Sequence, residues 1–237
     1  MNLHFAVAII LPVLINPFSK VSDIPVPDDY KRVPAASGSF ASWLRKLPLK
    51  QSRTVYLYNG MPKRNQTAQY CVLDIPTGRE DLQQCADAVM RLRAEYLFEQ
   101  ERWNELVFRD NAHKAYCYRG GRQRSGFETY LRTVFAYCGT ASLEKQLQPL
   151  RSLAAIQPGD VFIKGGFPGH AAIVVDVAIN ARGEKIFLLA QGFMPAQDMH
   201  ILKNPGDSGL SPWYKAVENQ PVITPEWTFS PRELRRW

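Results

Sequence analysis

The chain has 237 residues, of which 46% are apolar and 11% aromatic, so it is long enough and apolar enough to bury a sizeable core. Charged residues make up 22% of the sequence, and 15 glycines and 17 prolines are spread along it, which excludes a coiled coil, a collagen-like repeat and a low-complexity linker. Lysine and arginine exceed aspartate and glutamate by 29 to 22, and this net charge of +7 favours anionic partners but is too diffuse to indicate nucleic acid.

The N-terminal segment is predicted to be an export signal. Its apolar run from Phe5 to Ile15 contains no charge, fits the length of a secretory hydrophobic region and is too short to span a bilayer. No later run approaches the roughly 20 apolar residues that a membrane helix needs. We therefore expect residues 1–19 to direct the protein to the periplasm or outside the cell, and residues 20–237 to form one domain.

The first half of this domain mixes a hairpin with a long helix. A short helix is predicted at 39–47, and residues 54–60, which end in Asn59-Gly60, predict a hairpin with 68–75 as the returning strand. Residues 79–103 then have the longest helical pattern in the chain, with acidic residues at the start. One stripe of this helix carries Leu82, Cys85, Val89, Leu92 and Tyr96.

The second half changes from helix to sheet. Residues 107–126 lack periodicity and are interpreted as a basic loop, and residues 127–147 predict a second helix. From residue 156 the pattern is that of strands, at 160–166, 170–180 and 185–193, with a turn at 181–184. Together these elements predict an α+β fold in which helices pack on an antiparallel sheet.

His170 is the strongest candidate for a general base. It follows the bend at Gly169 and opens an apolar strand, a position that holds an imidazole rigidly at the edge of a loop. A turn centred near residue 181 or 182 places Gln191 opposite or diagonal to His170, and cross-strand neighbours lie only about 5 Å apart at Cβ. Gln191 is thus predicted to orient the ring through the nitrogen not used in proton transfer. Asp176 lies about 20 Å further along the strand and is less suitable.

Cys85 is the best placed nucleophile. It lies in the first turns of the long helix, where the positive end of the helix dipole favours a thiolate. The alternative is that Cys85 is a small apolar residue on the core face, since it shares a stripe with Leu82 and Val89. The remaining cysteines are Cys71, Cys117 and Cys138, and the even total favours one or two disulfides whose pairing the sequence does not decide.

A metal-dependent hydrolase is a less favoured alternative. It would use His170, His200 and Asp176, but these residues lack the local spacing of known ligand motifs. We therefore expect no metal and no cofactor.

The segments GDVFIKGGFPGHAAIVVDV and KIFLLAQGF resemble those of the NlpC-type and CHAP-type members of the papain-like superfamily. The resemblance implies a papain-like fold and a hydrolase of amide bonds, often those of peptidoglycan, with Cys85 as nucleophile, His170 as base and Gln191 as third member. The sequence departs from the pattern at Gln191, where His, Asn, Asp or Glu is more usual, and at Gln84, where Asp or Asn is common. These departures motivate the alternative of a catalytically inactive module that binds an envelope glycan or protein.

Four further residues are predicted to border a substrate groove. They flank the strands that carry the histidine and the glutamine, and they are Gly169, Phe193, Met194 and Trp213. The proposed substrate is peptidoglycan or another anionic polymer of the envelope.

A closer resemblance covers nearly the whole mature chain. The segments IPVPDDYKRV, SFASWLRKLPL, DLQQCADAVMRLRAEYL, HAAIVVDVA, LLAQGFMPAQDMHILKNP and SPWY are similar to those of a bacterial family called domain of unknown function 4846. The family name conveys no activity, so the hydrolase hypothesis depends on the cysteine, the histidine and the glutamine.

Overall fold

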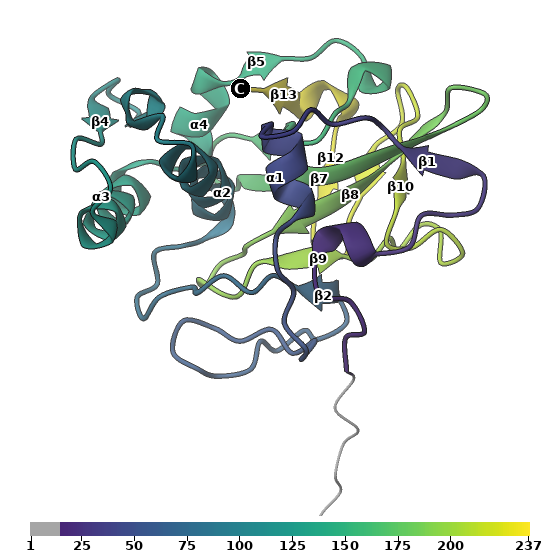
Figure 1. The fold of residues 1–237 in the computed structure, drawn as a ribbon, viewed down its shortest axis with the longest axis horizontal. Helices are drawn as coiled ribbons and strands as arrows, with labels where there is room; N and C mark the ends of the chain where they lie inside the picture. Colours follow the sequence, from purple (N-terminus) through teal and green to yellow (C-terminus); the bar gives the residue numbers. More distant parts are fainter. Residues whose placement is uncertain (1–14) are drawn as a thin grey trace, which may run out of the picture.

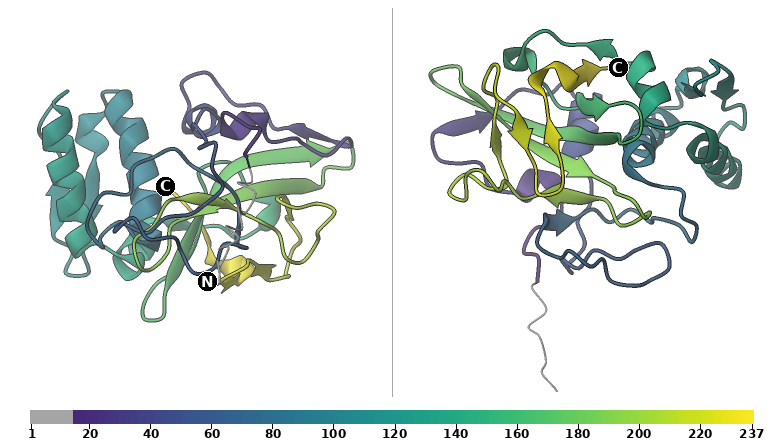
Figure 2. Two further views of the ribbon diagram at one scale, coloured as in Figure 1. Left: turned by 90° about the horizontal axis from the view of Figure 1, so that it is seen from below. Right: turned by 180° about the vertical axis from the view of Figure 1, so that it is seen from behind.

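The computed structural model describes residues 15–237 (Figure 1). Four α-helices form within this range: α1 (Phe40–Arg45), α2 (Cys85–Glu99), α3 (Arg124–Tyr137) and α4 (Thr140–Gln146). Figures 1 and 2 show α2, α3 and α4 gathered at one end of the sheet, while α1 lies across β7. None of the helices in this range combines the length and the apolar composition needed to cross a bilayer.

The main sheet is antiparallel, with the strand order β2-β9-β8-β7-β6-β13-β5 and with β1 and β10 paired to β7 and β8. Its nine strands are β1 (Tyr30–Arg32), β2 (Gln69–Val72), β5 (Gln148–Pro149), β6 (Val161–Lys164), β7 (His170–Asn180), β8 (Lys185–Gln191), β9 (His200–Leu202), β10 (Tyr214–Lys215) and β13 (Leu234–Arg236). Two small ribbons pair β3 (Val107–Arg109) with β4 (Ala115–Cys117) and β11 (Val222–Ile223) with β12 (Thr228–Phe229). The α+β class with helices on an antiparallel sheet is thereby confirmed.

The core has one layer on each face of the sheet. Along β7, Ala171 and Ile173 point to the face covered by α2, whereas Ala172 and Val174 point to the other face and pack with β12. This division follows from the alternation of side chains along a strand. In the right-hand view of Figure 2, which shows the molecule from behind, the C-terminal strands in yellow lie over the second face. We call the α2 side the helix face and the β12 side the C-terminal face.

The hairpin of β7 and β8 is the centre of the sheet and forms where the sequence predicted it. Its turn spans residues 181–184, closed by a hydrogen bond from Asn180 N to Glu184 O of 3.0 Å, and Gly183 takes a positive φ of 82° that favours glycine. Ile179 pairs with Lys185 near the turn. A register shift between Val174 and Asp176 changes the pairing by one residue, so that Ile173 pairs with Ala190.

Asp176 anchors the N-terminal segment to β7. Its carboxylate is fully buried and accepts hydrogen bonds of 2.6 Å from Nε of Arg32, on β1, and from Nε of Arg45, on α1. Two guanidinium groups satisfy a charge that burial would otherwise make costly. The carboxylate therefore holds β1 and α1 against the central strand.

Four predicted elements differ from the structure. The long helix predicted at 79–103 forms only over Cys85–Glu99, so Leu82 precedes it instead of lying on its stripe. The Asn59-Gly60 turn exists, with Leu57 N donating to Met61 O at 2.8 Å, but the chain folds back immediately and β2 pairs with β9 instead of with 54–60. The helix predicted at 127–147 is interrupted at Cys138-Gly139 and forms α3 and α4. The predicted basic loop contains the β3–β4 ribbon, whose three-residue strands are too short to give a periodic signal.

Part of the predicted signal segment belongs to the folded domain. Residues 1–14 lie outside the described residues, but Asn16 is buried, and its side-chain amide donates to Phe18 O and Lys50 O at 3.0 Å. The ring of Phe18 stacks on that of Tyr70 with centroids 6.1 Å apart. The packing of the domain thus begins before residue 20.

The cysteines are unpaired. All four, which are Cys71, Cys85, Cys117 and Cys138, are free thiols. They lie on β2, at the start of α2, on β4 and just after α3, so four different elements carry them. The disulfides that the even number of cysteines suggested are not formed in this structure.

Candidate active site

His170 lies at the first position of β7 with its side chain on the C-terminal face. It is only 2% exposed, and its ring lies 4.9 Å from that of Phe193, 5.3 Å from that of Trp227 and 5.7 Å from that of Phe229, between centroids. Burial lowers the pKa of His170 to about 4, although the hydrogen bond with Gln191 and the charge of Glu226 oppose the shift. The imidazole is therefore neutral at pH 7, as a general base must be.

Gln191, the last residue of β8, contacts the imidazole. Because Ile173 pairs with Ala190, Gln191 lies diagonal to His170 on the same face of the sheet. Its Oε1 is 2.8 Å from Nε2 of His170, and the residue is 1% exposed. The hydrogen bond predicted from the strand register is thus confirmed. The catalytic role of the pair stays a prediction.

Polar groups from distant segments surround Gln191. Its Nε2 donates to Oε2 of Glu226 at 2.9 Å and lies 3.4 Å from Nε2 of His200. Glu226 in turn accepts from Nζ of Lys63 at 2.6 Å and from Nδ2 of Asn65 at 3.2 Å. The sequence analysis missed Glu226, Lys63 and Asn65, because they lie in irregular segments without periodicity and far from the hairpin.

Cys85 is the first residue of α2. The helix begins here because the Asp87 carboxylate accepts from the backbone N–H of Gln84 at 3.0 Å, which caps the first turn. The side chain is partly buried, and burial raises the pKa of the Cys85 thiol, while backbone N–H groups of Ala86, Ala171 and Cys85 itself act in the opposite direction. The thiol therefore lies at the backbone amide that follows His170.

The thiol and the imidazole approach the end of β7 from different sides. Helix α2 packs on the helix face, whereas the imidazole points to the C-terminal face. Within residues 15–237, no side-chain hydrogen bond joins Cys85 to His170. The structure thus places Cys85 next to the backbone of the predicted base but leaves the thiol without an imidazole partner.

The four predicted groove residues lie in different settings. Gly169 has no room for a side chain, since a Cβ would lie 2.4 Å from Gly166 O and 2.5 Å from Thr140 Oγ1. Phe193 packs on the imidazole, and Met194 beside it is 58% exposed. Trp213 is not brought to this group, because its buried ring donates from Nε1 to Pro25 O at 2.7 Å at the Asp176 end of the sheet.

Of the three residues of the metal-dependent alternative, His170 and His200 both lie against the Gln191 amide, but Asp176 is remote from them. Asp176 is engaged with two arginines, six positions along β7 from His170. His200 is fully buried, and its Nδ1 lies 2.9 Å from Asp198 O. Among the residues that the structure describes, no group of three or more His, Cys, Asp or Glu side chains is arranged to hold a metal ion.

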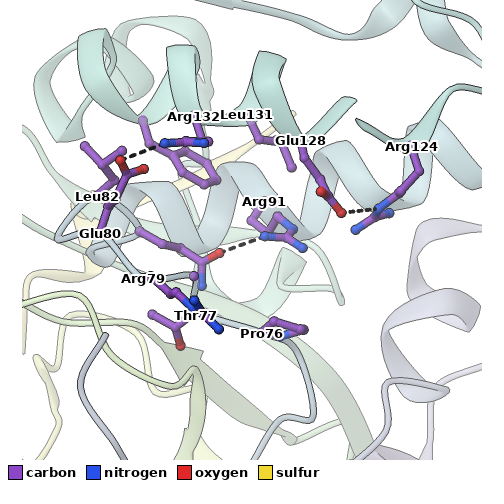
Figure 3. Close-up of a pocket in the computed structure, with 13 residues that line it drawn as sticks. Pro76, Thr77, Arg79, Glu80, Leu82, Arg91, Arg124, Glu128, Leu131 and Arg132 are labelled. Atoms are coloured by element: carbon purple, nitrogen blue, oxygen red, sulfur yellow. Dashed lines mark hydrogen bonds and ion pairs between the residues drawn. The ribbon is translucent and has the colours of Figure 1, made fainter. Parts of the chain in front are cut away.

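A cavity of about 510 Å³ lies between α2, α3 and the segment that precedes Cys85 (Figure 3). Leu82 and Gln83, which are three and two residues before Cys85, are part of its wall. Most of its charged groups are paired, Arg132 with Glu80 at 2.7 Å and Arg124 with Glu128 at 3.1 Å. Cys85, His170 and Gln191 do not line this cavity.

The fold and the site define an α+β protein with a buried histidine–glutamine pair at the end of its central hairpin. A family model described as domain of unknown function (4846) matches residues 21–120 and 110–236, so the chain belongs to this family. Neither the comparison with curated proteins nor the comparison with solved structures found a match.

Proposed function

We propose that this protein is a cysteine-dependent amide hydrolase or acyl transferase of papain-like type, with Cys85 as nucleophile, His170 as base and Gln191 as the residue that positions the base. The observation that carries the proposal is the junction of α2 with β7. There, a thiol on the first residue of a helix lies at the amide adjacent to a neutral imidazole, and that imidazole is held by an amide oxygen at 2.8 Å. These are the parts that thiol catalysis needs.

The proposed reaction uses the nitrogen of His170 that does not contact Gln191. As Nδ1 takes the thiol proton, the Cys85 sulfur attacks the carbonyl carbon of the substrate. The resulting oxyanion would accept hydrogen bonds from backbone N–H groups at the start of α2, which have no partner inside the helix. The N–H group of Cys85 is the first of them. His170 then returns the proton to the leaving nitrogen as the C–N bond breaks. Water, or an acceptor amine, finally cleaves the thioester and restores the thiol.

The resting structure favours a neutral thiol and a neutral imidazole over an ion pair. Burial raises the pKa of Cys85 and lowers that of His170, so both effects oppose the charged form of the pair. Proton transfer would accordingly occur during attack on the substrate, and it requires a rearrangement at the start of β7 that brings the imidazole from the C-terminal face to the thiol on the helix face. Phe193, packed on the imidazole, would keep water from the His170–Gln191 hydrogen bond.

We also propose the substrate class and the location. The substrate is a peptidoglycan-like peptide of the cell envelope, in keeping with the resemblance of segments 159–177 and 185–193 to those of envelope hydrolases and with the net charge of +7. The location is extracytoplasmic, which rests on the apolar run at the N-terminus.

Hydrolysis of purified peptidoglycan tests this proposal. The wild type is expected to release new amino termini from sacculi, detected by labelling and mass spectrometry, and Cys85→Ala to lose at least a thousandfold of the rate. Cys117→Ala is the matched control, because Cys117 is an exposed thiol on β4 and should leave the rate unchanged. Equal rates for the wild type and Cys85→Ala would rule out Cys85 as the nucleophile.

A second candidate function is a binding module without catalysis. It is favoured by the absence, within residues 15–237, of a hydrogen bond between Cys85 and His170, and by the burial of the histidine. This candidate predicts that sacculi retain the protein in a pull-down with equal efficiency for the wild type and Cys85→Ala, and that no amino termini are released. Release by the wild type alone would exclude it.

A further inference from the structure

The polar side chains around His170 leave only one consistent assignment of hydrogens. A carboxylate can only accept hydrogen bonds, so Oε2 of Glu226 must face the NH₂ group of Gln191 at 2.9 Å. Lys63, with its Nζ 2.6 Å from the same oxygen, can only donate. The opposite amide orientation would bring two acceptor oxygens together. Glu226 therefore fixes the orientation of the Gln191 amide group.

His200 supplies an independent constraint on the same amide. Its Nδ1 lies 2.9 Å from the backbone oxygen of Asp198, which only accepts, so Nδ1 carries the hydrogen. The ring is neutral at pH 7, since burial lowers the pKa of His200 to about 4, and Nε2 is then an acceptor. That nitrogen lies 3.4 Å from Nε2 of Gln191, which can give it the second amide hydrogen.

The orientation of Gln191 determines the tautomer of His170. With both amide hydrogens directed at Glu226 and His200, Oε1 is the atom that faces His170. The imidazole nitrogen at 2.8 Å, Nε2, must then donate, and Nδ1 keeps a free lone pair. Without Glu226 and His200 the amide group of Gln191 could turn over, and it could then form a hydrogen bond with either tautomer of His170.

We propose that Glu226 is a positioning residue that, with Lys63 and His200, locks Gln191 and thereby holds His170 in the Nε2–H tautomer. The catalytic value of the lock rests on the proposed function, because a base needs its lone pair on the nitrogen that receives the thiol proton. The tautomer itself does not depend on that function. The carboxylate of Glu226 places next to Gln191 the negative charge that a glutamine lacks.

The ring nitrogens of His170 report the tautomer directly. In histidine-labelled protein at pH 7.5, long-range ¹H–¹⁵N spectra are expected to show a single Nε2–H tautomer for His170, assigned by comparison with His170→Asn. The variant Glu226→Gln keeps an oxygen that can accept from both Lys63 and Gln191, and it is expected to retain this tautomer. The double variant Lys63→Met/Glu226→Leu removes the acceptor and the buried charge together, and it should give a mixture with a populated Nδ1–H form.

The matched control is Lys215→Met/Asp207→Leu, which removes an ion pair of 3.2 Å at an exposed site and should leave the spectrum unchanged. The proposal is overturned if wild-type His170 is found as Nδ1–H, a result that needs no variant to fold. It is also overturned if the folded Lys63→Met/Glu226→Leu variant retains a single Nε2–H tautomer. Because no substrate is used, loss of the Cys85 hypothesis in the sacculus assay would leave this test intact.

Discussion

Gly192 meets Gln84 where helix α2 begins. A Cβ on Gly192 would lie 2.9 Å from the carbonyl oxygen of Gln84 and 3.0 Å from Cβ of Ala88. The absence of a side chain just after Gln191 therefore lets the start of α2, with Cys85 on it, approach the end of the central hairpin.

Gly192→Ala is accordingly expected to push α2 away from β8. The contact is with backbone and with a short side chain that cannot turn aside, so we expect a loss of about 1–3 kcal/mol in the free energy of unfolding, measured by urea denaturation. Gly209→Ala is the control, because its Cβ would meet only Asp207 Oδ1 at 3.6 Å, an ordinary contact. Equal stability of the two variants would contradict the close approach of helix and hairpin.

Asp176→Asn should destabilise the domain strongly. The substitution leaves the guanidinium groups of Arg32 and Arg45 facing a neutral amide in a buried position, and breaking a buried ion pair from one side costs about 3–5 kcal/mol. Urea denaturation measures the change. Asp207→Asn, at an exposed ion pair with Lys215, should change stability by less than about 1 kcal/mol. A similar small effect for both substitutions would show that Asp176 does not anchor the N-terminal segment.

Acid should destabilise the fold well above the pH at which carboxylates titrate. Burial lowers the pKa of both His170 and His200 from 6.5 to about 4, so between these values the unfolded chain binds more protons than the folded one. The stability that the two neutral histidines contribute to the folded state is fully present above pH 6.5 and is lost as the pH falls toward 4. Each histidine should lower the free energy of unfolding by about 2 kcal/mol as the pH falls from 7 to 5. Denaturation midpoints that do not move in this range would contradict the burial of the two rings.

The Cys85 thiol should react as a protonated thiol in the resting protein. Because burial raises the pKa of Cys85, alkylation by iodoacetamide should be slow at pH 7 and should accelerate only at a higher pH than for an ordinary thiol, followed site by site by peptide mass spectrometry. The exposed thiol of Cys117 provides the internal comparison. Faster alkylation of Cys85 than of Cys117 at pH 7 would show a thiolate already present, and the proton transfer proposed above would then precede substrate binding.

Local patterns were sufficient for the central hairpin and for one contact of the site. The apolar strand patterns in 170–180 and 185–193, with a turn between them, predict the register to within a residue or two, and that register brings Gln191 to His170. The hairpin predicted from Asn59-Gly60 was wrong about its partner strand. A turn dipeptide determines where the chain reverses, whereas the strand with which β2 pairs depends on backbone groups of β9, over 120 residues away.

The outer part of the site could not be predicted. Lys63 and Glu226 are separated by 163 residues, and neither lies in a periodic segment. Polar residues in irregular chain carry no signal of their partners, because their contacts are made only when the C-terminal segment covers the second face of the sheet.

The amino-acid sequence by itself determined the class of fold, the long helix that carries Cys85, and the pairing of His170 with Gln191, since each depends on short-range periodicity or on antiparallel geometry. Only the tertiary structure decided on which face of the sheet each group lies. Side chains alternate along a strand whatever covers it, and long-range packing directs α2 to one face and β12 to the other. That packing places the imidazole within a polar network and leaves the thiol at the backbone amide beside it.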